Sequence, residues 1–179
     1  MKNFLMILIT AALAFFAHHF LSSPSYSATT EITVDNFLDI AKADLATESS
    51  KSENVVFYES QITFSNFITS DTVGIERVMN VIQDTSMCIQ FHHRGTKTYI
   101  TKTHSYWLED IPVNLDRLIT LDSAITRLNM ANVPKPKTRI CILRNVLGPT
   151  PTTPAYIFGT HGTGFVRVDG YTGEVSTIE

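Results

Sequence analysis

Near its C-terminus the sequence reads Tyr156-Ile-Phe-Gly-Thr-His-Gly-Thr-Gly164 and then Phe165-Val-Arg-Val-Asp-Gly-Tyr-Thr-Gly-Glu-Val175. Residues 165–169 alternate apolar and polar side chains, which predicts a strand with one buried face. Asp169-Gly170 and Thr172-Gly173 are pairs that reverse the direction of the backbone. The stretch therefore predicts a strand, a tight turn, a second strand and a turn bounded by glycine.

The residues before this hairpin predict a helix and one more strand. Thr120 is a predicted N-cap, because the residues after it repeat at the spacing of one apolar helical face: Leu121, Ala124, Ile125 and Leu128. Asn132-Val-Pro134 ends this helix. Arg139 to Val146 predicts a strand, and the three prolines between Leu147 and Pro154 predict a loop.

The N-terminal half begins with a second amphipathic helix, for which Thr33 is the predicted cap. Its apolar face is predicted to hold Val34, Phe37, Leu38, Ala41 and Leu45, and its outer face Asp35, Asp39, Lys42 and Asp44. A polar hinge follows at 46–54. The β-branched and aromatic run from Val55 to Ile68 predicts one long bent strand or two short ones.

Two further segments complete this half. Ile75, Val78, Met79 and Ile82 recur at helical spacing behind Asp71, which predicts a short helix. Residues 87–92 then alternate, and with a turn around Arg94-Gly95 and a return over 99–103 they predict a hairpin with one buried face. Residues 105–118 are expected to form a connector that its aromatic residues pack down.

These elements predict the α+β class, with an antiparallel meander sheet and amphipathic helices packed on one face. Both halves share the order of a capped helix, a polar hinge and several strands, without a residue-by-residue repeat. Two helix-plus-meander repeats that share a sheet would bury both one-sided helices. The alternative is a single sheet of roughly five to seven strands with helices on one face.

The N-terminal segment has the layout of a secretory signal peptide. Lys2 precedes an apolar run over 4–17, and a polar stretch of small residues leads to a predicted cleavage after Ser27. A retained membrane anchor is the alternative, but the run is shorter than the roughly 20 apolar residues that a spanning helix needs. We therefore expect a signal peptide at 1–27 and an exported protein, periplasmic or secreted. No stable membrane span is expected after cleavage.

Composition limits the classes of partner. The chain has 14 basic and 17 acidic residues, a formal net charge of −3, so it lacks the basic footprint of a nucleic-acid-binding protein. Its two cysteines, Cys88 and Cys141, lie in predicted strands, and an even count in an exported protein favours a disulfide. Two separate buried thiols are the alternative.

From Leu121-Asp122-Ser-Ala-Ile125 to Val175 the chain resembles the PepSY domain. The ending of that family, a final hairpin with Asp, Thr-Gly and Glu-Val, matches Asp169, Thr172, Gly173, Glu174 and Val175. The loop at 148–154 and the turn at 159–164 are not part of the family pattern. The resemblance implies a small non-catalytic module of exported proteins, which binds or restrains a peptidase or another envelope protein. It divides the mature chain into 28–115, of unassigned family, and 116–179.

The sequence contains no recognisable set of catalytic residues. His161-Gly162-Thr163-Gly164 is similar to the oxyanion loop of esterases, but the chain has no Gly-x-Ser-x-Gly. His92 and His93 are adjacent in a predicted strand and point to opposite faces, so they cannot share a metal. The acidic pair Glu109-Asp110 has no evident second partner. No metal or other cofactor is expected.

The sequence therefore favours a non-catalytic binding or inhibitory module over an enzyme. The candidate binding residues are an aromatic pair, a loop histidine and the polar residues of the last turn: Tyr106, Trp107, His161, Asp169, Thr172 and Glu174. For the turn residues, a role in fixing the fold is an equally direct explanation. Two alternatives stay open, namely a small hydrolase that uses His161 or another histidine, and an immunity-type protein that protects against a toxin.

Overall fold

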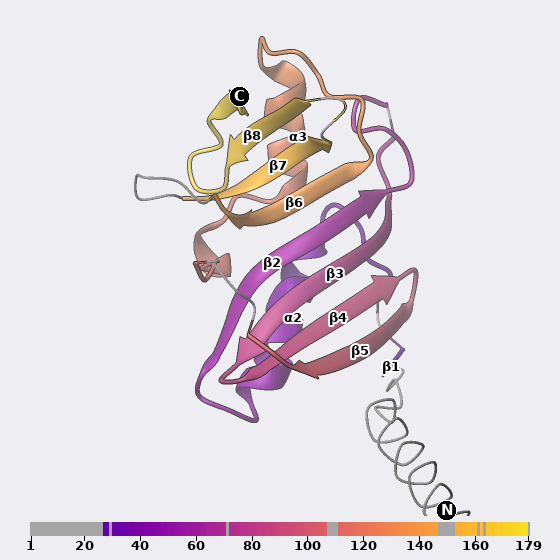
Figure 1. The fold of residues 1–179 in the computed structure, drawn as a ribbon. Coiled ribbons are helices and arrows are strands. Elements are labelled where there is room, and N and C mark those ends of the chain that lie inside the picture. The colour runs from indigo at the N-terminus through magenta and orange to yellow at the C-terminus, as the bar shows by residue number, and fades with distance from the viewer. Residues whose placement is uncertain are drawn as a thin grey trace, which may run out of the picture.

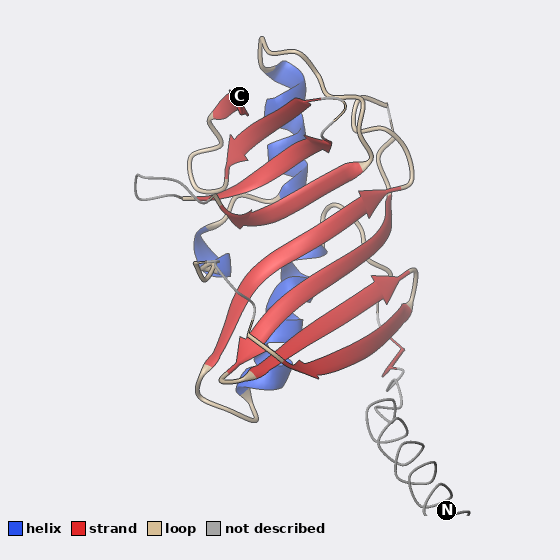
Figure 2. Cartoon of the chain, in the orientation of Figure 1, coloured by secondary structure: helices blue, strands red, loops and turns tan. Residues whose placement is uncertain are grey.

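A computed structural model describes residues 27–28, 30–70, 72–106, 111–146, 153–160, 162 and 164–178. The predicted signal peptide, apart from Ser27, lies outside these residues, as do Trp107, Glu109, Asp110 and His161. The described part of the chain forms one nine-stranded antiparallel sheet and two α-helices (Figures 1 and 2). This confirms the predicted α+β class and the antiparallel sheet. None of the described helices has the length and apolar character required to cross a membrane.

The elements follow one another in two runs of similar order. They are β1 Ser27–Ala28, α2 Phe37–Ser49, β2 Val55–Phe64, β3 Ile75–Asp84, β4 Met87–Arg94, β5 Lys97–His104, the 3-10 helix η1 Leu115–Arg117, α3 Leu121–Met130, β6 Ile140–Asn145, β7 Pro154–Thr160, β8 Gly164–Asp169 and β9 Val175–Ile178. The order in the sheet is β1-β5-β4-β3-β2-β6-β7-β8-β9. The first long strand of each run, β2 and β6, therefore pair near the middle of the sheet.

Both helices lie behind the sheet in the view of Figure 2, α2 behind the strands of the first run and α3 behind those of the second. We call this side the helix face and the opposite side the outer face. Fully buried aromatic side chains of the strands fill the helix face, among them Phe57, Phe64, Tyr156 and Phe158. They belong to the same hydrophobic cluster as Phe37 of α2 and the helical residues Leu121 and Leu128 of α3. One continuous core thus spans both halves.

The helix starts follow local side-chain chemistry. Thr120 caps α3 as predicted, because its Oγ1 accepts a hydrogen bond from the Ser123 amide at 3.2 Å. For α2 the prediction of Thr33 as the cap is wrong. The helix begins at Phe37 after Asn36, and Thr33 instead exchanges bonds with Asn36: the Thr33 amide donates to Asn36 Oδ1 at 2.7 Å, and the Asn36 amide donates to Thr33 Oγ1 at 3.3 Å.

The predicted short helix around Ile75 to Ile82 is wrong, since these residues form strand β3. β3 pairs with β2 on one side and β4 on the other. Val78 and Ile82 are buried on the helix face, and Val81 is buried on the outer face. A strand that is buried on both faces loses the simple apolar–polar alternation, so its apolar spacing resembled that of a helix.

The β4–β5 hairpin is present, but its turn lies one residue later than predicted. Arg94 pairs with Lys97, so Gly95 and Thr96 form the turn, and Gly95 has a φ of +58°. His92 consequently pairs with Tyr99. Tight hairpin turns need residues with positive φ, and glycine adopts such a conformation readily.

The predicted disulfide between Cys88 and Cys141 is wrong, because both cysteines are free and buried. Cys88 lies on β4 and Cys141 on β6, with β3 and β2 between them. Three strand spacings amount to about 14 Å, whereas a disulfide requires Cα atoms within about 7 Å. The two side chains also point to opposite faces, since Cys88 pairs with Gln83 on the outer face and Cys141 with Ile62 on the helix face. Burial raises the pKa of both thiols.

Candidate functional site

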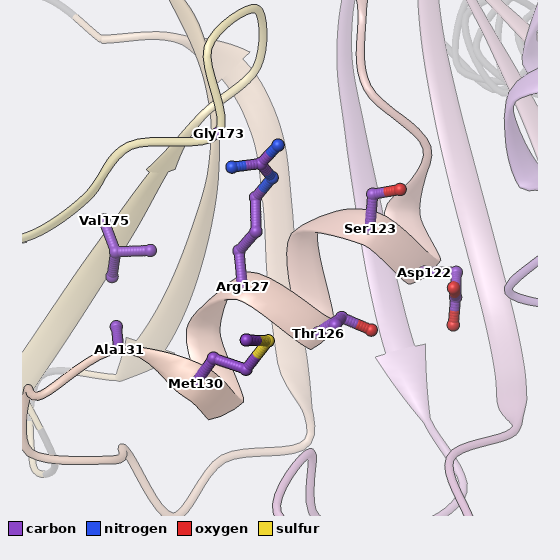
Figure 3. A pocket seen from close by; sticks show the side chains of 8 residues that line it. All are labelled: Asp122, Ser123, Thr126, Arg127, Met130, Ala131, Gly173 and Val175. Carbon is purple, nitrogen blue, oxygen red and sulfur yellow. The ribbon is translucent and has the colours of Figure 1, made fainter.

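A groove of about 570 Å³ lies between α3 and the turn that joins β8 to β9 (Figure 3). We call it the α3 groove. Six of its lining residues come from α3 or directly follow it, and two come from the turn and β9: Asp122, Ser123, Thr126, Arg127, Met130, Ala131, Gly173 and Val175.

The helical period explains which residues of α3 line the groove. The predicted apolar face of α3 is confirmed, as Leu121, Ala124, Ile125 and Leu128 are all buried. Asp122, Thr126 and Met130 stand four residues apart and therefore form a stripe on another side of the helix. Met130 is 82% exposed, the largest exposed fraction among the exposed large apolar residues of the described chain. The groove therefore has the carboxylate of Asp122 at one end of this stripe and the exposed side chain of Met130 at the other.

The β8–β9 turn forms the opposite wall, and Asp169 fixes its shape. Asp169 Oδ1 accepts hydrogen bonds from the amides of Tyr171 and Thr172, each at 2.9 Å. Asp169 Oδ2 accepts from Thr153 Oγ1 and, at 3.1 Å, from Arg167 Nη2. Burial acts to raise the pKa of Asp169, but these hydrogen bonds outweigh it and hold the pKa below its ordinary value. The carboxylate is therefore a fixed acceptor for the turn.

Gly173 brings this turn into contact with α3. Its φ is +73°, a left-handed conformation that glycine adopts without cost. A Cβ at this position would lie 2.4 Å from Cδ and Nε of Arg127, so the turn and the arginine side chain touch closely. In Figure 3 Arg127 extends from the helix toward Gly173. The arginine thus bridges the two walls of the groove.

Three of the residues predicted for binding lie together in the β8–β9 turn. Asp169 is buried and serves the turn, whereas Thr172 and Glu174 are exposed and flank Gly173 of the α3 groove. Tyr106 is 65% exposed, but it follows β5, which is next to the edge strand β1, whereas β9 forms the opposite edge of the sheet. The structure therefore does not bring Tyr106 to the turn. Trp107 and His161 are outside the described residues.

The sheet edge next to the groove is formed by β9. This strand pairs with β8 on one side, and no strand among the described residues pairs with its other side. Ser176, Thr177 and Ile178 are exposed, and Val175 both lines the α3 groove and packs on the core. The sequence does not show that the β8–β9 turn contacts α3. The residues of α3 that line the groove could therefore not be identified from the sequence alone.

A second polar cluster is buried between α2 and the sheet, and the sequence analysis missed it. Asp44 was assigned to the outer side of its helix, but it is 7% exposed and faces the sheet. Its Oδ2 lies 2.7 Å from His93 Nε2 and accepts a hydrogen bond from Asn80 Nδ2, also at 2.7 Å. The spacing in the sequence could have indicated this burial. Four buried residues recur at i, i+4, i+7 and i+11 and thus share one helical face: Phe37, Ala41, Asp44 and Glu48.

This cluster contains a serine, a histidine and an aspartate, but not in a hydrolytic arrangement. Ser60 Oγ donates to Asn80 Oδ1 at 2.5 Å, and His93 Nδ1 is bonded to Thr98 Oγ1 at 2.9 Å. The serine is therefore bonded to the amide and not to the histidine that would have to activate it. Every member is buried below the helix, which makes the cluster a structural network.

Metal ligation finds no support in the described part of the chain, where no group of three or more His, Cys, Asp or Glu side chains is placed to hold an ion. His92 lies on the outer face, where its ring stacks on Tyr99 and its Nε2 is 3.1 Å from Thr101 Oγ1. Burial, together with the neighbouring His93, lowers the pKa of His92.

We compared the chain with protein-family models, with curated proteins and with solved structures, and none of the three comparisons gave a match. The resemblance to the PepSY domain therefore stays a prediction from the residues of the closing hairpin.

Proposed function

We propose that this protein is an exported, non-catalytic binding module of PepSY-like type, and that it binds an extended segment of a partner protein along β9 and the α3 groove. The observation that carries the proposal is the position of the groove beside an edge strand with no neighbour among the described residues. An edge strand offers a row of backbone N–H and C=O groups that an extended peptide can pair with.

If a peptide binds by strand addition, it uses both the edge strand β9 and the α3 groove beside it. A peptide that pairs with β9 extends the sheet by one strand, about 4.8 Å further out. Alternate side chains of that peptide then point toward the helix face, where the Asp122, Thr126 and Met130 stripe of α3 is uncovered. The backbone bonds supply affinity, and the groove selects side chains.

The chemistry of the groove favours a segment with an apolar anchor. Met130 is exposed and flexible, and methionine adapts its shape to apolar groups of a partner. Arg127 and Asp122 add one charge of each sign at the rim. An apolar side chain over Met130, flanked by polar residues, is the pattern we expect in the bound segment.

The proposed class of partner, a peptidase or another envelope protein, rests on the resemblance to PepSY. The duplicated arrangement also belongs to this proposal: α2 with β2–β5 and α3 with β6–β9 are two helix-plus-meander units whose first strands pair. In this arrangement the second unit carries the matched hairpin and the groove.

A peptide selection tests the binding mode. Peptides selected from a displayed library against the full-length protein are expected to protect the backbone amides of β9 from hydrogen exchange. Met130→Glu should weaken their binding at least tenfold, because it places a charge where the apolar anchor lies. Phe67→Glu is the matched control, since Phe67 is 50% exposed and far from the groove residues in sequence. Selected peptides that leave β9 unprotected, or that ignore Met130→Glu, would contradict the proposal.

Export has its own test. The mass of the protein recovered from outside the cytoplasm should correspond to a chain that starts at Ala28. A recovered chain that still carries residues 1–27 would support the anchor alternative.

A further inference from the structure

The outer face of the sheet carries a second hollow, of about 410 Å³, over strands β2 to β5. We call it the outer-face pocket. Its lining residues Arg77, Met79 and His92 are on the outer face by the strand register, and this face is the side of the sheet toward the viewer in Figure 1. Its volume falls within the range of small-molecule sites.

Positively charged residues form a row at one end of this pocket, and two of them, Arg77 and Arg94, line it. Arg77 pairs across strands with Thr63, and Arg94 pairs with Lys97. Val78 pairs with His93, so Arg77 and Arg94 occupy neighbouring positions on adjacent strands. The strands β3, β4 and β5 thus present Arg77, Arg94 and Lys97 in one row, although like charges placed opposite one another destabilise a sheet.

No acidic side chain among the described residues forms a salt bridge with any of these three cations. The salt bridges of arginine in this part of the molecule join Arg139 to Glu76 and Arg144 to Glu59 instead. The Nε–H of Arg77 donates a hydrogen bond to Thr63 Oγ1 at 3.1 Å, so this contact uses neither of the terminal nitrogens of Arg77. Within the part of the chain that the structure describes, this cationic row therefore has no acidic salt-bridge partner, although the net charge of the protein is −3.

The next row along the same strands is apolar and aromatic. It consists of Met79, His92 and Tyr99, which all line the pocket. The rings of His92 and Tyr99 stack at 4.5 Å between centroids and 3° between planes. Because burial lowers the pKa of His92, this ring is uncharged at neutral pH, and the positive charge comes from the row beside it.

We propose that the outer-face pocket binds a small organic oxyanion, with the anionic group held by Arg77 and Arg94 and the apolar part lying against Met79 and the His92–Tyr99 stack. Guanidinium groups match the geometry of carboxylate and phosphate oxygens, and two of them on neighbouring strands converge on one anion. The bound anion removes the repulsion within the row. This ligand is a small molecule, and its site is on the other face of the sheet from the partner-binding groove.

Titrations of the full-length protein by two-dimensional NMR test this site with three probes: phenyl phosphate, inorganic phosphate and phenol. Phenyl phosphate is expected to shift the resonances of Met79, His92 and Tyr99 saturably. It should bind at least tenfold more tightly than either of the other probes, because only it supplies both parts of the ligand.

Charge-removing variants identify the groups responsible. Arg77→Gln and Arg94→Gln should each weaken phenyl phosphate binding about tenfold, the usual scale for one hydrogen bond to a charged group. Arg94→Gln should also have a Tm no lower than that of the wild type, because it relieves the repulsion within the row. Lys137→Gln removes an exposed charge outside the pocket and should leave binding unchanged.

The proposal is overturned by an absence of saturable shifts, by equal affinity for phosphate and phenyl phosphate, or by an equal loss in Lys137→Gln. Met130→Glu should not affect this titration, so failure of this site and failure of the α3 groove are separate results.

Discussion

The carboxylate of Asp44 on α2 and the imidazole of His93 on β4 lie 2.7 Å apart, with 9% and 2% of their side chains exposed. Asn80 and Thr98 complete the hydrogen bonds of this pair from β3 and β5. A buried pair of this kind contributes little beyond what apolar residues would, but removing one partner is costly. The pair therefore fixes where α2 sits on the sheet.

Asp44→Ala is expected to destabilise the protein by about 3 kcal/mol or more, because it leaves the polar groups of His93 and Asn80 buried without their acceptor. Urea denaturation at neutral pH measures the change. Asp39→Ala, on the exposed side of the same helix, should stay within about 0.5 kcal/mol of the wild type. Similar losses in the two variants would show that Asp44 acts only through helix propensity.

Glu48 predicts a dependence of stability on pH. Burial acts to raise the pKa of Glu48, but hydrogen bonds from Lys51 at 2.8 Å and Lys102 at 2.9 Å outweigh it and lower the pKa in the folded state. A lowered pKa means that the carboxylate stabilises the fold above the unfolded-state value, near 4.5, and that this contribution is lost as the pH falls through the folded-state pKa.

The measurement is the difference in unfolding free energy between the wild type and Glu48→Gln across this pH range. The difference should be largest near neutral pH and shrink toward zero in acid. Glu53→Gln, at an exposed site, should give a small difference throughout. A Glu48→Gln difference that does not change with pH would argue against the two lysine contacts.

Alanine substitutions at Gly95 and Gly173 distinguish two causes of lost stability, a left-handed backbone conformation and a steric contact of the added Cβ. Gly95→Ala and Gly173→Ala both force alanine to positive φ, and each should cost about 1–2 kcal/mol on that account. A Cβ at Gly95 meets nothing within 4 Å, whereas at Gly173 it meets Arg127. Gly173→Ala should therefore cost more, and the excess should vanish in an Arg127→Ala background. An excess that persists there would place the strain elsewhere.

The two cysteines give the simplest test of strand order. In the native protein both thiols should react slowly with iodoacetamide, because they are buried and burial raises their pKa. In denaturant without reductant, the intact mass should show two adducts. No adducts under those conditions would mean a disulfide, which the separation of β4 from β6 forbids.

Local patterns in the sequence were sufficient where neighbours along the chain decide the structure. The start of α3 at Thr120 and the closing turn at Asp169 depend on side chains that bond to amides two or three residues away. β3 could not be predicted in the same way, because its conformation depends on pairing with β2 and β4. For the α3 groove, the sequence pointed to Thr172 and Glu174, which flank Gly173, but to none of the residues of α3 that line the groove.

The sequence by itself determined the α+β class, the two helices and the closing hairpin, because capping, helical period and strand alternation act over a few residues. Only the tertiary structure decided that Asp44 is buried against His93, that Cys88 and Cys141 are too far apart to bond, and that Arg77 and Arg94 are neighbours. Each of these depends on which strands lie side by side. That order is set by how both halves bury their apolar faces in one core, and a local sequence pattern does not contain it.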